Sequence, residues 1–290
     1  MEMYPSVSWN FLGLSPSETS FEKAKFIILP IPFDSTSSYR PGSRDGPSRI
    51  IEASRYVELF DVELAEEPYL KGVFTLDELE PVRGNPAETI ERISQATKYV
   101  IDNRKIPILI GGEHTITLGA VSVLPKDSIV VILDAHADLR YSYQGDSLSH
   151  ACVTRRILEK SLGTVQIGVR SMSEEEYTYV KENNLTLYYR DTIRKSGLNP
   201  FLQDLKKNIE SRSVYLSIDV DVLDPSEAPG VSTPEPDGLS FFEAKEIIKQ
   251  ICCSSHIKGI DIVEVTPLHG NTVTEFLAAS LLYKAIGYIQ

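Results

Sequence analysis

Cysteine is scarce in this sequence, which excludes a fold held together by disulfides. The 290 residues contain three cysteines, Cys152 and the adjacent pair Cys252 and Cys253. Disulfide scaffolds are much shorter and much richer in cysteine, and free thiols are typical of a reducing compartment. We therefore expect a cytoplasmic protein in which the cysteines are structural.

Long apolar runs and clusters of basic residues are also absent. No stretch approaches the roughly 20 apolar residues that span a bilayer, and the first residues lack the segments of a signal peptide. Lysine and arginine number 29 against 41 acidic residues, which gives a net charge of −12. Because nucleic acids and anionic membranes attract basic surfaces, we expect neither as a partner.

Internal repeats and Pro/Gly/Ser-rich linkers are missing as well. Hydrophobic residues make up 42% and charged residues 24%, close to globular averages, which excludes a largely disordered chain. The length alone allows two domains or one large domain. Since no linker divides the chain, we expect a single domain over residues 1–290.

Short apolar runs rich in β-branched residues recur along the chain and predict strands. They lie at residues 26–31, 106–111, 128–134, 164–169, 214–219 and 257–265. Unbroken apolarity indicates that a strand is buried on both faces, which is typical of a parallel sheet between layers of helices. The pattern therefore predicts the doubly wound α/β class.

Capping signals predict helices between these strands. Asn85 with Glu88 marks one helix start, and residues 274–286, apolar nearly all round, predict a buried helix. Two capping boxes are predicted, Ser173 with Glu176 and Ser240 with Glu243.

Residues 32–47 form the longest stretch that is dense in turn-forming residues. Loops of this length in a compact domain are usually functional or mobile. Two interpretations stay open: the loop walls a site, or it is an ordered surface turn before a helix that begins near Ser48.

Histidines and acidic residues gather where the predicted strands end, which is where open parallel sheets bind their ligands. These residues are His114, Asp134, His136, Asp138, Asp219, Asp221 and Glu264. Each motif alone has a structural explanation, because an Asp-x-Asp can cap a turn and a lone histidine is often a loop residue. The stretch DAHAD at 134–138 is harder to explain in this way, since alternation can turn its three polar side chains to one side.

Four aspartates buried together repel one another and need a positive counter-charge. No nearby lysine cluster supplies it, whereas two divalent ions balance four carboxylates and leave His114 and His136 neutral. Nitrogen and oxygen ligands without a thiolate favour Mn²⁺ or a similar first-row ion. A pair of such ions activates water, so the pattern predicts a hydrolase.

Two further residues are candidates for catalysis. His150 lies after the metal motif and could move a proton to a leaving amine, or it could cap a helix that begins near Ala151. Glu264 has no basic neighbour in sequence and would suit recognition of a cation. His256 and His269 stand apart and are expected to be non-catalytic.

Five segments, in order, resemble the ureohydrolase family of arginases and agmatinases. They are GGEHT (111–115), DAHADLR (134–140), SHACVTRR (149–156), residues 217–240 and DIVEVTP (261–267). Residues 32–50 resemble the agmatinase branch in particular. The resemblance implies a three-layer α/β/α sandwich around a parallel sheet, two Mn²⁺ per subunit, and a homo-oligomer, either a trimer or a hexamer.

The resemblance also assigns roles to the candidate residues. One ion would be held by His114, Asp134, Asp138 and Asp219, and the other by His136, Asp134, Asp219 and Asp221. Glu264 would bind the guanidinium of a small cationic substrate, His150 would relay protons, and Asp138 would also hydrogen-bond the attacking hydroxide. The implied reaction splits a guanidino group into urea and an amine, most simply agmatine into urea and putrescine, a step of polyamine biosynthesis.

Departures from the family pattern leave the substrate open. Glu113 stands where many members have Asp, and we expect it to change only packing or hydrogen bonding behind the ligands. Residues 139–149 lack the Asn and Ser pattern with which arginases hold an α-carboxylate, which disfavours arginine. Arg140, if it points inward, would instead favour guanidinobutyrate or formiminoglutamate. A different metal-dependent hydrolysis on this scaffold and a non-enzymatic assembly role also stay open.

Overall fold

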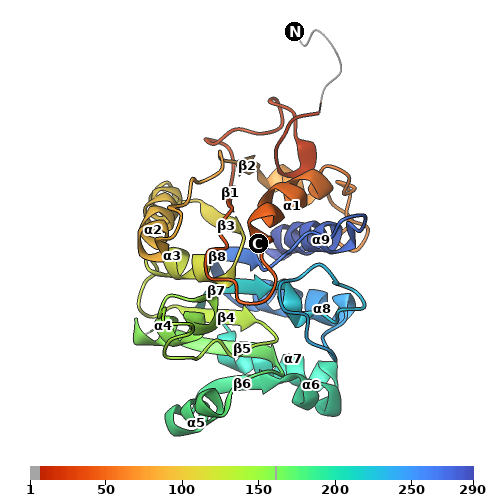
Figure 1. Cartoon of the computed structure of the whole chain (residues 1–290). Helices are drawn as coiled ribbons and strands as arrows, with labels where there is room; N and C mark the ends of the chain where they lie inside the picture. Colours follow the sequence, from red (N-terminus) through yellow and green to blue (C-terminus); the bar gives the residue numbers. More distant parts are fainter. Residues whose placement is uncertain (1–6, 161) are drawn as a thin grey trace.

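The computed structural model describes residues 7–160 and 162–290, which form a single parallel sheet covered by helices (Figure 1). The strands run in the order β2-β1-β3-β8-β7-β4-β5-β6. They are β1 (Phe26–Ile31), β2 (Val73–Thr75), β3 (Ile106–Gly111), β4 (Ile129–Leu133), β5 (Gly163–Val169), β6 (Thr186–Tyr189), β7 (Ser213–Asp219) and β8 (His256–Val263). Every pairing between these strands is parallel.

The six predicted strands are confirmed within two residues at each end, and the two strands that sequence reasoning missed lie at the sheet edges. β2 has three residues, only one of them buried, and no residue of β6 is buried. The search for unbroken apolar runs detects strands covered on both faces, so it passes over short edge strands.

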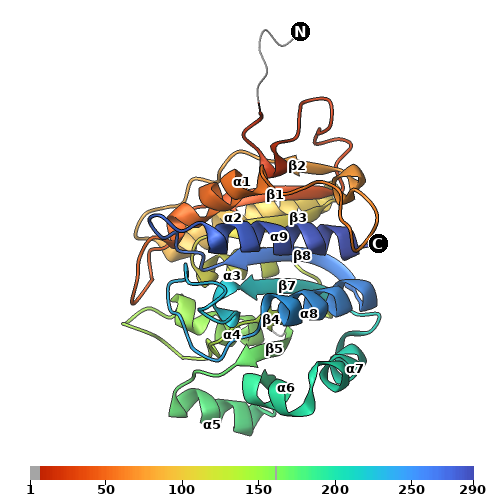
Figure 2. The ribbon, with the colours of Figure 1, turned by 90° about the vertical axis from the view of Figure 1, so that its right-hand side faces the viewer.

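Helices cover both faces of the sheet, which confirms the α/β/α sandwich. Figure 1 shows α2 to α5 on one side and α1 with α6 to α9 on the other, and Figure 2 shows α8 and α9 in front of the sheet. The helices are α1 (Gly46–Ser54), α2 (Pro86–Asp102), α3 (Thr117–Val121), α4 (Val153–Glu159), α5 (Glu174–Asn183), α6 (Arg190–Ser196), α7 (Leu198–Ile209), α8 (Phe241–Ser254) and α9 (Val273–Tyr288). None of the helices in the described part of the chain is both long and apolar enough to cross a bilayer.

The predicted capping signals are present. Asn85 accepts a hydrogen bond from the backbone N–H of Glu88 at 3.1 Å, and both predicted capping boxes form at the starts of α5 and α8. The buried helix predicted at residues 274–286 is α9. These local hydrogen bonds satisfy the free N–H groups of the first turns and so place the helix starts.

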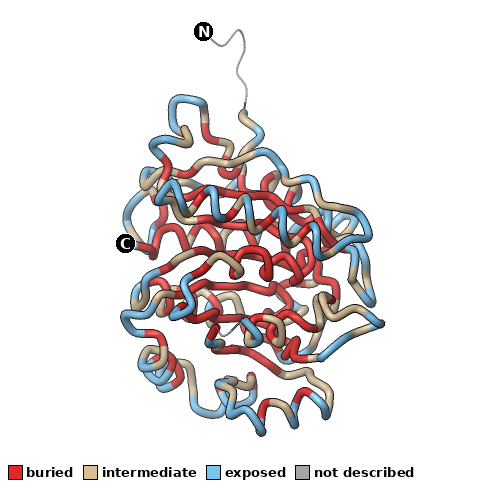
Figure 3. The backbone as a smooth tube through the Cα atoms, turned by 90° about the vertical axis from the view of Figure 1, so that its left-hand side faces the viewer, coloured by how far each residue is buried: buried red, intermediate tan, exposed pale blue. Residues whose placement is uncertain are grey.

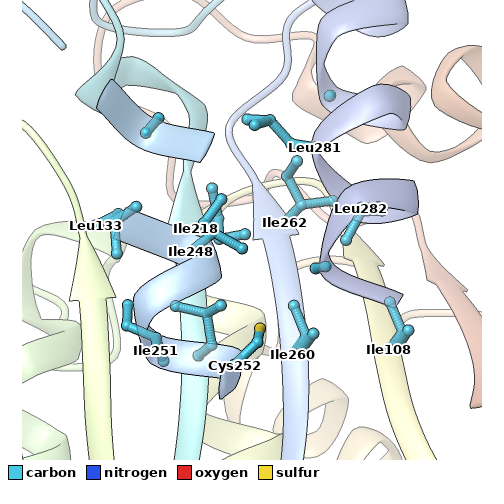
Figure 4. Packing of buried hydrophobic residues seen from close by; sticks show 14 of the residues in the cluster. Ile108, Leu133, Ile218, Ile248, Ile251, Cys252, Ile260, Ile262, Leu281 and Leu282 are labelled. Atoms are coloured by element: carbon cyan, nitrogen blue, oxygen red, sulfur yellow. The ribbon is translucent and has the colours of Figure 1, made fainter. Parts of the chain in front are cut away.

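The apolar core fills both spaces between the sheet and the helices. Figure 3 shows the buried chain segments gathered in the interior, with exposed segments on the outside. In Figure 4, Leu282 of α9 lies beside Ile262 of β8, and Ile248 of α8 lies beside Ile218 of β7. Cys252 is part of this core, as expected of a structural cysteine, whereas Cys253 is exposed. The packed core leaves the strand ends as the place where polar side chains can gather.

The loop after β1 is shorter than predicted. A 3-10 turn forms at Ser43–Asp45 and α1 begins at Gly46, two residues before Ser48. Pro47 lies in the first turn of α1, where its missing N–H costs nothing. The irregular segment is therefore residues 32–42.

Candidate metal centre

The predicted metal ligands and Glu264 lie at the ends of the four central strands. β3, β8, β7 and β4 are neighbours in the sheet, and their carboxyl ends meet at one edge. His114 begins the turn after β3, Asp134 follows β4, Asp219 ends β7 and Glu264 follows β8. Side chains scattered over 150 positions of sequence are thereby brought to one place.

The first ligand group surrounds Nδ1 of His114. This atom lies 3.1 Å from Asp134 Oδ2, 3.2 Å from an oxygen of Asp138 and 3.4 Å from an oxygen of Asp219. All four side chains are buried. Together they present one nitrogen and three carboxylate oxygens to a common point.

The second ligand group surrounds Nδ1 of His136, which lies 2.9 Å from Asp221 Oδ2 and 3.6 Å from Asp134 Oδ1. Asp134 thus directs one carboxylate oxygen to each histidine. His114, Asp134 and Asp219 form one set of ligand atoms within 4.8 Å of one another, and Asp134, His136 and Asp221 form another. Asp134 is common to both sets, as a bridging ligand would be.

Unpaired polar atoms mark this cluster as a place for cations. Nδ1 of His114 and Oδ2 of Asp134 are buried, and neither has a hydrogen-bond partner among the described residues. Such groups are costly to bury unless something compensates them. Burial and the Asp221 and Asp134 carboxylates raise the pKa of Asp219 well above its usual value, and burial with Asp134 raises that of Asp138 to about 6. The residues therefore fit divalent metal ions.

In the absence of metal, protons on the two histidines compensate part of the negative charge of the carboxylates. Burial alone would lower the pKa of His114 and His136, but the carboxylates that face them raise it in both cases. Metal binding must displace these protons, so it is expected to weaken as the pH falls.

Hydrogen bonds behind His114 fix its orientation. Its Nε2 lies 3.0 Å from Ser217 Oγ, and that hydroxyl donates to Asp261 Oδ1 at 2.6 Å. Because the single hydrogen of Ser217 goes to Asp261, Ser217 accepts from Nε2–H, which leaves the lone pair of Nδ1 toward the ligand cluster. Sequence reasoning missed Ser217 and Asp261, although a lone carboxylate within the apolar β8 was a signal.

Two of the predicted site residues occupy left-handed backbone conformations. Asp138 has φ of 50° and Glu264 has φ of 65°, values that non-glycine residues adopt at a cost. The N–H of Glu264 donates to Gly112 O at 2.7 Å, and its carboxylate accepts from the N–H of His114 at 2.8 Å. These contacts hold Glu264 beside the first ligand group, and burial raises its pKa to about 7.

A cavity of about 270 Å³ opens onto this cluster. Seven of the eight predicted site residues line it: His114, His136, Asp138, His150, Asp219, Asp221 and Glu264. Asp134, the eighth, is fully buried between the two histidines. His256 lies at the start of β8 and His269 lines a different cavity, as expected for residues outside the site.

Arg140 lines the same cavity, so it points inward. Its Nε lies 3.9 Å from a Glu176 oxygen, and its guanidinium lies 5.0 Å from the ring centre of Tyr143. The carboxylate and the ring take up part of its charge and planar surface. Arg140 is therefore held at the cavity wall with its charge already partly compensated by Glu176, so its inward position does not by itself favour an anionic substrate.

His150 does not cap a helix, contrary to the structural interpretation of this residue. A 3-10 turn at His150–Cys152 has Ser149 as its N-cap, and α4 has Cys152 in that position. Instead, His150 lines the cavity between Ser38 and Tyr143. Ser38 of the loop at residues 32–42 thus lines the cavity, which favours the interpretation that this loop walls the site.

Two residues join the loops around the site: Arg170, which sequence reasoning missed, and Glu113, for which it predicted only a change in packing or hydrogen bonding. Arg170 donates to the carbonyl oxygens of Asp221 and Glu235, both at 2.8 Å, and so ties a ligand to the segment that lines the cavity. Buried Glu113 accepts from the N–H and the hydroxyl of Thr36, both at 2.7 Å, and burial raises its pKa to about 7. No local pattern signals these contacts, because their partners are distant in sequence.

Known proteins resemble the chain over nearly its whole length. The model of the Arginase family matches residues 24–287. N(1)-aminopropylagmatine ureohydrolase of Synechocystis sp. is 34% identical over 284 residues, covering 94% of this chain and 92% of that protein. The protein of the same name from Thermococcus kodakarensis is 38% identical over 272 residues, covering 92% and 91%. Agmatine ureohydrolase of Thermoplasma volcanium superposes with a TM-score of 0.86 at 38% identity, covering 93% of this chain and 91% of that one.

Proposed function

This chain belongs to the arginase family and is an agmatinase-like ureohydrolase, and we propose that it hydrolyses agmatine to putrescine and urea with two Mn²⁺ per subunit. One observation carries the proposal. Two ligand groups, each made of one histidine and neighbouring carboxylates, share Asp134. Both lie beside the buried carboxylate of Glu264 at a single cavity.

The metal ligands proposed are those predicted from the sequence. His114, Asp134, Asp138 and Asp219 would hold one ion, and His136, Asp134, Asp219 and Asp221 the other. Their nitrogen and oxygen donors suit manganese, and no thiolate is among them. When bound, a pair of divalent ions supplies water that is acidic enough to act as a nucleophile near neutral pH.

The remaining residues bind the substrate and move protons. Glu264 would receive the guanidinium, because a cation compensates a carboxylate that burial otherwise disfavours. Asp138 would accept a hydrogen bond from the attacking water and orient it. His150 would pass a proton to the nitrogen that leaves, since an alkylamine is a poor leaving group until it is protonated.

A second candidate substrate is N(1)-aminopropylagmatine, which relatives at 34% and 38% identity carry in their names. This compound is agmatine extended at its far amine, so both substrates place the same guanidino group beside Glu264. They differ only near the cavity wall that contains Arg140 and Tyr143. Guanidinobutyrate, formiminoglutamate and arginine are further candidate substrates.

The test is urea release from a panel of agmatine, N(1)-aminopropylagmatine, guanidinobutyrate and arginine, with manganese content measured on the same sample. Formiminoglutamate is followed by formamide release. We expect agmatine to give the highest kcat/KM, and two manganese ions per chain. A higher kcat/KM for N(1)-aminopropylagmatine would identify this compound as the substrate in place of agmatine. Manganese-loaded protein that cleaves none of these compounds would overturn the proposal.

We also propose that the chain forms one domain and assembles as a trimer or hexamer in the cytoplasm, where it contributes to polyamine biosynthesis. The family resemblance supports the assembly, and scarce cysteine supports the compartment. Sedimentation of the purified protein would test the assembly: a monomer would contradict it.

A further inference from the structure

We propose that Thr36 and Glu113 are positioning residues that set which ring nitrogen of His150 carries the proton. The contacts that carry this inference belong to the loop at residues 32–42 and to the turn after β3. Its catalytic consequence rests on the proposed function, whereas the assignment of the proton does not.

The hydroxyl of Thr36 has more partners than hydrogens. Its Oγ1 lies 2.7 Å from Glu113 Oε1, 2.9 Å from the backbone nitrogen of His150 and 3.3 Å from Nδ1 of the same residue. A hydroxyl donates once and accepts twice. When Glu113 is ionised, as at the alkaline pH of the NMR test below, its carboxylate can only accept, and the backbone N–H can only donate, so the hydrogen of Thr36 goes to Glu113. A lone pair of Oγ1 then faces Nδ1, which favours a proton on Nδ1.

Glu113 is held firmly as the acceptor. Its second oxygen accepts from the backbone N–H of Thr36 at 2.7 Å, and its own N–H donates to Phe33 O at 2.7 Å. A Cβ on Gly112 would lie 2.1 Å from Phe33 O, so the loop rests directly on the backbone of this turn. Glu113 is one methylene longer than the aspartate that is more usual here, and each of its two oxygens accepts a hydrogen bond from Thr36.

The other contacts of His150 are compatible with this arrangement. Ser149 Oγ also lies 3.3 Å from Nδ1, and its hydroxyl can turn to accept from it. Ser38 Oγ lies 3.3 Å from Nε2 and can donate to it. The opposite arrangement would set a lone pair of Nδ1 against the lone pair of Thr36. Nε2 is therefore the unprotonated nitrogen, on the ring edge that faces the cavity-lining Ser38.

An unprotonated Nε2 suits the proposed proton transfer. When water adds to the guanidinium carbon, Nε2 can take a proton from it and then release that proton to the nitrogen whose bond to the carbon breaks. Both protons of the water end on that nitrogen, which leaves as an alkylammonium ion carrying the charge, while the carbon leaves as urea. A histidine with its proton on Nε2 could not begin this sequence.

Nitrogen-15 NMR of histidine-labelled, full-length protein tests the assignment directly, because protonated and unprotonated ring nitrogens have different shifts. His150→Asn identifies the His150 signals, and spectra are recorded at alkaline pH, where imidazole is neutral. We expect the proton on Nδ1. In Glu113→Gln, the amide oxygen accepts from Thr36 N–H and the amide NH₂ donates to Thr36 Oγ1. The hydrogen of the Thr36 hydroxyl then turns to Nδ1 of His150, and the proton on the His150 ring moves to Nε2. A wild-type proton on Nε2, or no shift in Glu113→Gln, would overturn the proposal.

Kinetics test the consequence through Thr36. Thr36→Val removes the hydroxyl and should lower kcat about tenfold with KM little changed, and Thr36→Ser should restore most of the loss. In a His150→Asn background, Thr36→Val should have no further effect. Thr97→Val is the matched control, because Thr97 is buried in α2 and its hydroxyl has no partner among the described residues. An equal loss with and without His150 would overturn the positioning role.

The two arms separate this inference from the proposed function. Loaded protein that cleaves none of the substrate panel contradicts the proposed function, yet the NMR result still decides where the proton lies. If Glu113→Gln fails to fold, Thr36→Val probes the same link: its His150 should lose the preference for Nδ1, and a retained preference would contradict the proposal.

Discussion

Two walls of the cavity are built on different principles. The ligand wall comes from the ends of the buried strands β3, β4 and β7 and contains His114, His136, Asp138, Asp219 and Asp221, with Asp134 buried behind them. The loop wall is the irregular segment at residues 32–42, which meets His150 through the hydroxyls of Thr36 and Ser38. Strand ends hold charges that repel one another until metal binds, whereas the loop orients the imidazole ring of His150 through hydroxyl groups.

The two walls are therefore expected to control different properties of the protein. Changes in the ligand wall should alter metal content, and with it the whole activity. Changes in the loop wall should leave the metal in place and alter the rate of proton transfer. Substitutions and pH changes that act on one wall at a time can test this separation.

The largest effect is expected from Asp219→Asn, which removes a charged member of the first ligand group. Activity should fall about a thousandfold together with manganese content. The metal-free variant should be more stable than metal-free wild type by about 1 kcal/mol, because burial opposes the charge of Asp219. Metal analysis and thermal unfolding check both, and full manganese content in the variant would contradict the account.

A smaller loss is expected from Glu264→Gln, which removes the charge but keeps an oxygen that can accept from the N–H of His114. We expect kcat/KM to fall about a hundredfold with both metal ions retained, since one partner of a buried charge pair is lost. Asp237→Asn is the control, because Asp237 is exposed and pairs with Arg194 outside the cavity. Loss of metal in Glu264→Gln would place Glu264 among the ligands instead.

The stability gained from metal should depend on pH. The pKa of Asp138 is raised to about 6 and that of Glu264 to about 7, so the folded metal-free protein binds more protons than the unfolded chain between about pH 4 and about pH 7. Its free energy of unfolding should therefore fall as the pH rises through this window, whereas the lowered pKa of Asp134 acts only below about pH 4.

Because protons compete with metal, the gain in unfolding free energy on adding manganese should grow over the same window by about 1 to 2 kcal/mol. This gain is observed as a larger rise in Tm. Calorimetry with and without manganese measures it. A constant rise in Tm from pH 4 to pH 7 would contradict the account.

The smallest effect is expected at the cavity wall, from Arg140. Arg140→Gln removes a positive charge and should favour agmatine over guanidinobutyrate by about fivefold in kcat/KM, because agmatine has a distal cation and guanidinobutyrate a distal carboxylate. An unchanged ratio would show that Arg140 does not contact the distal end.

Prediction from sequence was most successful where a residue follows a buried strand. Asp134 and Asp219 stand directly at the ends of unbroken apolar runs, so the sheet edge that receives them could be inferred before the structure. Thr36, Ser217 and Arg170 could not be found in this way. Their roles depend on partners such as Glu113 and Asp261 that only the folded chain brings near.

The most direct test of the account is the number of manganese ions bound per chain in wild type and in His136→Asn, measured by metal analysis after gel filtration. The shared carboxylate of Asp134 predicts two ions in wild type and one in the variant, with the first site of His114 still filled. A single ion in wild type, or two in the variant, would contradict a centre built from two histidine groups that share Asp134.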